Sequence, residues 1–208
     1  DVPASAIDKY LAVQGERFRN PILRIFHTEL EAVYEEKNRG LDNDGRKVNE
    51  KLFAELFKNH NYGLQTTIGT VEHLKNPSLI EIRKYFNTYY VPNNMGVIMS
   101  GDFDPDVMIK KIETTFSYMQ NKPVPKYTFQ PEQPITAPIA AEVTGPDAES
   151  VTIGFRLPGN KDKDVLLADL VGQILTNGKA GLMDLNLIKK QKLLGASASA
   201  FTLIDYGI

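Results

Sequence analysis

Apolar residues recur every three or four positions along much of the chain, which is the spacing of amphipathic helices. The clearest such run covers residues 22–38. We expect it to begin at Asn20–Pro21, with Asn as the N-cap and Pro at the first helical position. The same pattern and its capping residues predict helices over 48–57, 78–89, 105–118, 162–176 and 182–192. Residues 59–76 are predicted to be a loop.

Short apolar runs bounded by turn residues predict strands in the remainder of the chain. These runs lie at 95–100, 139–143 and 150–157, and a last strand is expected from about residue 196. Five prolines fall within 121–138, so no helix crosses this window, and we interpret it as an interdomain linker. The pattern therefore predicts an α+β fold in two parts, 1–120 and 139–208.

Composition excludes several classes of function. Hydrophobic residues make up 42 % of the chain and charged residues 24 %, which is ordinary for a globular domain, and the net charge is −2. Without a basic field, nucleic acid and anionic membranes are not expected as partners. No apolar run approaches the roughly 20 residues of a membrane span. The absence of cysteine excludes thiol catalysis and cysteine-ligated metals.

The helix predicted at 22–38 places two carboxylates beside an apolar stripe. Because a helix advances ~100° per residue, Glu29 and Glu36 stack two turns apart on the margin of that stripe. The stripe is formed by Ile22, Leu23, Phe26, Leu30 and Val33. A carboxylate near an apolar face needs a cation, either a metal or a basic side chain, or else it turns outward to solvent. Geometry alone leaves both interpretations open.

The order of motifs around these glutamates is similar to that of the pitrilysin and insulinase family of zinc metallopeptidases. The segments that carry the resemblance are Glu29–Asn38, Gly69–Leu74, Tyr85–Asn94 and Gly101–Pro105. That family binds zinc with His-x-x-Glu-His and a distant downstream Glu. The resemblance implies that Glu36 is this distant zinc ligand. It also implies that Glu29 supports the site without binding the metal.

The resemblance further implies a two-layer antiparallel sheet covered by helices. Residues 1–120 would be the C-terminal part of the zinc-bearing domain, and 139–208 the start of a second, similar domain. Because the family works as a two-half clamshell, the expected partners are a peptide substrate and a second half or partner subunit. A bacterial periplasm or cell envelope is the location we expect.

The His-x-x-Glu-His motif itself is absent from this sequence. Its three histidines, His27, His60 and His73, are not followed by Glu-His at the required offset. Two zinc ligands and the general base are therefore expected upstream, in a longer protein of which this chain is an internal piece. We expect the piece alone to be inactive and to bind zinc weakly or not at all, because zinc sites need about three protein ligands.

Two alternatives stay open at this point. One is a non-catalytic, peptide-binding or structural subunit of the same fold, and the other is an unrelated α+β binding module with Glu29 and Glu36 in ordinary salt bridges.

Two weaker patterns have simpler explanations. His27, Glu31 and Glu35 are expected to form a solvated helix face, and Asn177–Gly181 a turn between helices rather than a phosphate loop.

Overall fold

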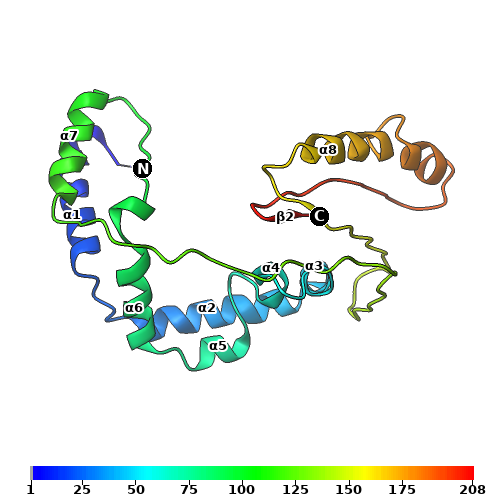
Figure 1. Cartoon of the computed structure of the whole chain (residues 1–208), viewed down its shortest axis with the longest axis horizontal. Coiled ribbons are helices and arrows are strands. Elements are labelled where there is room, and N and C mark those ends of the chain that lie inside the picture. Colours follow the sequence, from blue (N-terminus) through cyan, green and yellow to red (C-terminus); the bar gives the residue numbers. More distant parts are fainter. Residues whose placement is uncertain (1) are drawn as a thin grey trace. The chain divides into compact units, whose positions relative to one another are not determined.

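The computed structural model describes residues 2–208, which divide into two compact units (Figure 1). The first unit contains the chain up to Asp42 together with Gln65–Pro131. The second contains Asn43–Leu64 together with Glu132–Ile208. The chain thus enters the second unit early, leaves it after Leu64 and returns to it at Glu132.

The first unit is built from helices. In chain order its elements are η1 (Ala4–Ala6), α1 (Ile7–Arg19), α2 (Phe26–Leu41), α5 (Val71–Lys75), α6 (Leu79–Tyr89), η2 (Pro92–Asn94) and α7 (Pro105–Phe116). The predicted starts of α6 and α7 are confirmed by their caps. Ser78 Oγ accepts the N–H of Glu81 at 3.3 Å, and Asp104 Oδ1 accepts the N–H of Val107 at 3.0 Å.

The predicted start of the helix that carries the two glutamates is wrong. Asn20 does not begin a helix but ends α1, because its N–H bonds to the carbonyl of Glu16 at 3.1 Å. A turn closed by the Phe26 N–H and the Leu23 carbonyl follows, and α2 starts at Phe26. An Asn-Pro pair is compatible with either end of a helix, and here Asn20 is the C-cap of α1.

The predicted loop at 59–76 contains two short helices, α4 (Asn61–Leu64) and α5. A reciprocal capping box starts α5: Thr70 Oγ1 accepts the N–H of His73 at 3.3 Å, and His73 Nδ1 accepts the N–H of Thr70 at 3.4 Å. The capping box is usually recognised by Glu or Gln at its third helical position. Here the third helical position is a histidine, His73, so the sequence pattern did not predict the helix.

Close contact between α1 and α7 organises one side of the first unit (Figure 1). Gly15 of α1 is buried, and a Cβ at its position would lie 2.8 Å from Thr115 Cγ2. Next to it, the Tyr118 hydroxyl donates to the Gly15 carbonyl at 2.7 Å, and the Arg19 guanidinium lies 4.5 Å from the Tyr118 ring centre. The absence of a side chain at Gly15 is what allows the two helices to approach.

The second unit combines helices with a small antiparallel sheet. Its elements are α3 (Asp44–Leu56), α4, β1 (Leu157–Pro158), α8 (Asp164–Leu175), the π-helical turn η3 (Asp184–Ile188) and β2 (Tyr206–Gly207). The predicted helix at 162–176 is confirmed as α8. The helix predicted at 182–192 begins at residue 182 as predicted but ends at Ile188, and its last five residues form η3.

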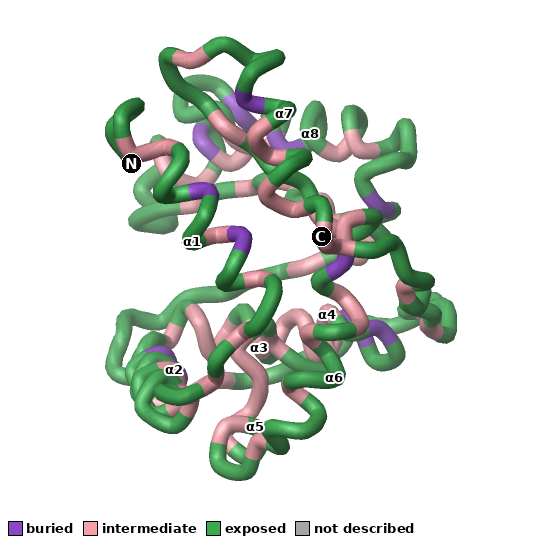
Figure 2. The backbone as a smooth tube through the Cα atoms, turned by 90° about the vertical axis from the view of Figure 1, so that its left-hand side faces the viewer, coloured by how far each residue is buried: buried purple, intermediate pink, exposed green. Residues whose placement is uncertain are grey.

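Phe57 and His60 are the most deeply buried large side chains of the second unit, each about 1 % exposed. The rings of Tyr62 and Tyr206 pack against Phe57 with centroid distances of 5.7 and 5.5 Å. Phe57 follows the last residue of α3, Tyr62 lies in α4 and Tyr206 in β2. The core of this unit therefore joins residues 43–64 to the end of the chain. Figure 2 shows how few positions of either unit are buried.

Most of the predicted strands are not strands in this structure. Residues 95–100 and 139–143 have no regular structure, and only Leu157–Pro158 of the 150–157 run is paired. The chain after Ala196 contributes only Tyr206–Gly207, which pairs antiparallel with β1 in the register Leu157↔Gly207. A strand exists only where a second backbone satisfies its hydrogen bonds, and a local apolar run cannot supply that partner.

The exposed faces of α8 and of residues 151–155 are strongly apolar. Val151, Ile153 and Phe155 are 88 %, 75 % and 72 % exposed, and α8 exposes Leu166 and Leu170. Gly154 lies between these exposed positions and faces α3. A Cβ at Gly154 would meet side-chain atoms of that helix. The alternation typical of a strand is therefore present although its ladder is not.

None of the helices among residues 2–208 is both long and apolar enough to cross a membrane.

The substitution Gly15→Leu should loosen the contact between α1 and α7 by about 1–3 kcal/mol, because the new side chain would overlap Thr115. Hydrogen-exchange mass spectrometry of peptides from both helices would measure this as faster exchange. Val13→Leu is the matched control, since Val13 lies on the same helix and is exposed. Equal exchange in the two variants would show that α1 and α7 do not depend on the absence of a side chain at position 15.

The Glu132 carboxylate should be the most sensitive polar group of the second unit. Its side chain is 2 % exposed, and it accepts the backbone N–H groups of Asn59 and His60 at 2.7 and 2.8 Å. Glu132→Ala should destabilise this unit by about 3–5 kcal/mol, because it leaves Arg156 and two backbone N–H donors without their acceptor. Exchange of the Asn59 and His60 amides measures the effect.

The exposed Glu142→Ala serves as the control for Glu132→Ala, and its effect should stay within about 0.5 kcal/mol. If exchange of the Asn59 and His60 amides were unchanged in Glu132→Ala, the buried carboxylate would not be the group that holds this segment.

Candidate functional site

Glu29 and Glu36, the two residues predicted to serve a metal site, lie on α2. Glu29 is in its first turn, where a carboxylate complements the positive end of the helix dipole, and Glu36 follows two turns later. Both residues are exposed to solvent. Neither therefore needs a buried cation to offset a cost of desolvation.

The buried face of α2 differs slightly from the predicted stripe. Phe26, Leu30 and Val33 are half-buried as expected, and the stripe continues to Lys37, which is buried. Ile22 was wrongly placed in it, since that residue precedes the helix and is 73 % exposed. A helix advances ~100° per residue, so Glu29 and Glu36 lie roughly 70° and 90° from the centre of this face.

The three histidines have roles other than metal binding in this structure. His27 is exposed on α2 with its ring against Phe26, and His73 completes the cap of α5. His60 is buried in the second unit. Glu31 and Glu35 are exposed, as expected for a solvated face, and Glu35 accepts a hydrogen bond from Asn38 at 3.5 Å. Within residues 2–208, no three His, Asp or Glu side chains are close enough together to hold a metal ion.

A buried polar cluster in the second unit was not anticipated from the sequence. His60 Nε2 lies 3.3 Å from Asp205 Oδ2, and His60 Nδ1 accepts the N–H of Tyr62 at 3.2 Å. With Nδ1 as acceptor, the ring proton lies on Nε2 and points to the carboxylate. The Tyr62 hydroxyl in turn accepts the N–H of Asp205 at 3.3 Å.

The second half of this cluster is the ion pair between Glu132 and Arg156. Arg156 Nη1 lies 3.5 Å from Glu132 Oε2 and donates to the Leu56 carbonyl at 2.6 Å, and Nη2 donates to the Gln133 carbonyl. The Tyr206 hydroxyl accepts the N–H of Glu132 at 3.1 Å. These side chains bond to one another and to the backbone, so the cluster joins distant chain segments rather than presenting a reactive group.

The partners in the cluster are far apart in sequence, which is why sequence reasoning missed them. Glu132 is 72 positions from His60, and Asp205 is 145 positions from it. No local pattern links residues at such separations. The one available signal was the presence of a charged Glu and Arg in runs otherwise typical of extended chain, next to Pro131 and Phe155.

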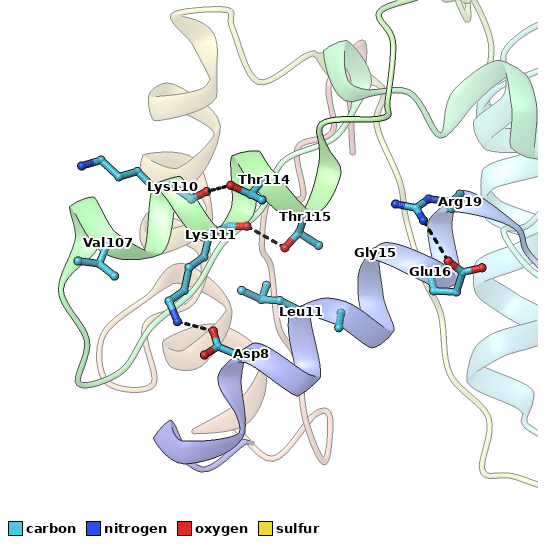
Figure 3. A pocket seen from close by; sticks show the side chains of 11 residues that line it. Asp8, Leu11, Gly15, Glu16, Arg19, Val107, Lys110, Lys111, Thr114 and Thr115 are labelled. Atoms are coloured by element: carbon cyan, nitrogen blue, oxygen red, sulfur yellow. Dashed lines mark hydrogen bonds and ion pairs between the residues drawn. The ribbon is translucent and has the colours of Figure 1, made fainter.

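A groove of about 650 Å³ lies along α1 and α7 of the first unit (Figure 3). Its floor includes Leu11 and Gly15, and its rim carries charges of both signs. Lys111 pairs with Asp8 across the groove, and Arg19 lies 3.5 Å from Glu16. These pairs neutralise one another, so the groove carries neither a field of one sign nor a set of convergent catalytic groups.

The loop at Asn177–Gly181 connects α8 to η3, as predicted for a turn between helices. Its backbone N–H groups point at the buried carboxylate of Asp184, which accepts those of Asn177 and Gly181 at 2.9 and 3.1 Å. The pKa of Asp184 lies below its usual range because of these backbone N–H groups. The largest effect comes from Asn177, followed by Gly181, Gly178 and Lys179. The chain's own carboxylate thus occupies the position that a phosphate would take in a phosphate-binding loop.

Comparison with known proteins identifies the family. A family model described as the peptidase M16 inactive domain matches residues 78–208. Among curated proteins, the chain is similar to the zinc protease PqqE of Helicobacter pylori, with 26 % identity over 179 residues, covering 84 % of this chain and 40 % of that protein. It is also similar to the probable zinc protease PqqL of Haemophilus influenzae, with 31 % identity over 98 residues, or 47 % of this chain and 10 % of that protein.

A solved protease from Helicobacter pylori shares the fold, with a TM-score of 0.67 at 19 % identity over 99 % of this chain and 51 % of that one. The chain therefore spans about half the length of the solved protease and less of the curated relatives. The family model covers well over half of the 208 residues. The resemblance to zinc metallopeptidases of the pitrilysin and insulinase type is thereby confirmed, and the chain belongs to the peptidase M16 family.

Proposed function

We propose that this chain is part of a zinc-dependent peptidase that hydrolyses peptides or small proteins, and that Glu36 supplies one of its zinc ligands. Two observations support the proposal: both curated relatives are named as zinc proteases, and α2 presents Glu36 to solvent. Because the chain covers 40 % of the first relative, the other ligands are proposed to lie in the rest of the protein.

The residues of this chain do not by themselves fit a catalytic zinc site. Such a site needs about three protein ligands, and the described residues offer no group of three in reach of one another. We therefore assign no catalytic step to the 208 residues alone. Their proposed contribution is one carboxylate held at a fixed place on a helix, where its backbone cannot move independently of the fold.

Glu29 is proposed to support the site rather than to bind the metal. At 1.5 Å per residue, the seven positions between Glu29 and Glu36 separate their Cα atoms by roughly 10 Å along α2. Zinc–oxygen bonds of about 2 Å favour direct binding by only one of them, with the other acting through a ligand or a water molecule.

The domain division proposed for the intact protein follows from the same family. Residues 1–120 would complete the zinc-bearing domain, 121–138 would link it to the next, and 139–208 would begin a second α+β domain with a two-layer antiparallel sheet covered by helices. The exposed alternation of Val151, Ile153 and Phe155 supports this, because such a face needs a neighbouring layer. A peptide substrate and a second half or partner subunit of a clamshell are the proposed partners.

A second candidate is a non-catalytic subunit that binds peptide or holds a partner. The description of the matched family domain as inactive favours it for residues 78–208. The helix α2, however, lies at Phe26–Leu41, outside that match. The zinc content of the intact protein distinguishes the two candidates.

In the intact protein, Glu36→Gln should abolish zinc retention, because the neutral amide is a poor ligand where the carboxylate bound the metal. Glu29→Gln should keep the zinc and lower the rate of peptide hydrolysis, because only a supporting group is lost. Zinc per protein chain is measured by elemental mass spectrometry, and hydrolysis with a fluorogenic peptide.

Glu35→Gln is the matched control for both variants, since it is an exposed glutamate on the same helix. Equal loss of zinc from the Glu29 and Glu36 variants would contradict the division of roles. An unsubstituted intact protein without zinc would favour the non-catalytic candidate instead.

The 208-residue chain alone should bind zinc more weakly than micromolar and should not hydrolyse peptide, because it offers a single proposed ligand. Titration with zinc followed by calorimetry checks the first point, and the fluorogenic peptide checks the second. Stoichiometric zinc of micromolar or better affinity in this chain would show that it contains a metal site other than the one proposed.

A further inference from the structure

The loop between α8 and η3 contains the only Asn-Gly dipeptide of the sequence, Asn177–Gly178. Both residues are exposed, and apart from the two neighbouring residues no heavy atom lies within 4 Å of the position that a Cβ of Gly178 would take. Asparagine followed by glycine is the pair most prone to intramolecular attack on the side-chain amide, because glycine places no side chain beside the backbone nitrogen that attacks. The loop therefore combines the reactive dipeptide with open space around it.

The side chain of Asn177 is held in a defined position by three hydrogen bonds. Its carbonyl oxygen Oδ1 accepts the N–H of Lys179 at 3.1 Å and that of Ala180 at 2.9 Å. Its amide nitrogen Nδ2 donates to the Gln173 carbonyl at 3.1 Å. Two backbone donors on one carbonyl oxygen stabilise negative charge that develops there when the carbonyl carbon is attacked.

The attacking nitrogen is also positioned by the loop. The Asp184 carboxylate, which is 6 % exposed, accepts the N–H groups of Asn177 and Gly181, on either side of Gly178. The Gly178 N–H is among the backbone groups that lower the pKa of Asp184, after those of Asn177 and Gly181. A carboxylate near an amide N–H attracts its hydrogen and increases electron density on the nitrogen. Asp184 thus faces the nucleophile, while Lys179 and Ala180 face the electrophile.

We propose that Asn177 is a site of deamidation promoted by this loop. The Gly178 nitrogen attacks Asn177 Cγ, the new C–N bond forms, and the Cγ–Nδ2 bond breaks. The proton of the Gly178 nitrogen passes through water to the leaving amide, which departs as ammonia and leaves a five-membered succinimide. Water then opens the ring at either carbonyl, giving aspartate or isoaspartate, and no reactant other than water is required.

Aspartate or isoaspartate at position 177 would change the contacts of this loop. A carboxylate at position 177 no longer donates to the Gln173 carbonyl, so one hydrogen bond is lost. It also adds a negative charge to a loop whose N–H groups already bind the Asp184 carboxylate. Isoaspartate also lengthens the backbone by one carbon atom, which moves the N–H groups that surround Asp184. Deamidation is therefore expected to loosen Asn177–Gly181 and to make the protein more negative by one charge.

The test compares the folded chain with a synthetic peptide spanning residues 173–184, both kept in mildly alkaline buffer at body temperature. Peptide mapping by mass spectrometry follows loss of ammonia, gain of water and the separation of aspartate from isoaspartate at Asn177. We expect conversion of Asn177 to be several-fold faster in the folded chain than in the peptide. An equal or slower rate in the folded chain would overturn the proposal, because the loop would then be neutral or protective.

Two controls make the assignment specific. Asn186 is exposed in the same unit and is followed by Leu, so it should convert at least about tenfold more slowly than Asn177. Asn177→Gln should remove the new acidic species seen by isoelectric focusing. Persistence of that species in Asn177→Gln would place the modification elsewhere and would contradict the proposal.

Discussion

The buried carboxylate of Glu132 is the group on which the second unit depends. It accepts two backbone N–H groups from the 59–60 turn and pairs with Arg156, whose guanidinium also bonds the carbonyl that ends α3. Three segments separated by long stretches of chain meet at this one side chain. A charge this deeply buried is stable only with such partners. The three segments must therefore pack together for any of them to be stable in this arrangement.

That constraint explains why residues 43–64 belong with the C-terminal part of the chain. Phe57 and His60 provide the apolar and polar halves of the same core, against Tyr206 and Asp205 respectively. The first unit has a different basis, the close approach of α1 and α7 at Gly15. The helix α2, which carries both candidate glutamates, belongs to this first unit and is not held by the buried ion pair.

Membership of the peptidase M16 family and the exposure of α2 fit together physically. The metal-binding role proposed for Glu36 needs a side chain that faces outward from its own helix. Glu29 and Glu36 do so, at the margin of the half-buried stripe. The apolar faces of α8 and of residues 151–155 are also exposed.

The sequence by itself determined the helices with strong caps, such as those starting after Ser78 and Asp104, because a cap is a contact between residues three apart. It also determined the family and the two candidate glutamates, through the order of its motifs. Only the tertiary structure decided that Asn20 ends a helix and that most of the apolar runs stay unpaired. Only the tertiary structure revealed the cluster around Glu132 and His60. Strand ladders and buried ion pairs are made between residues that no local pattern connects, so their partners appear only once the chain has folded.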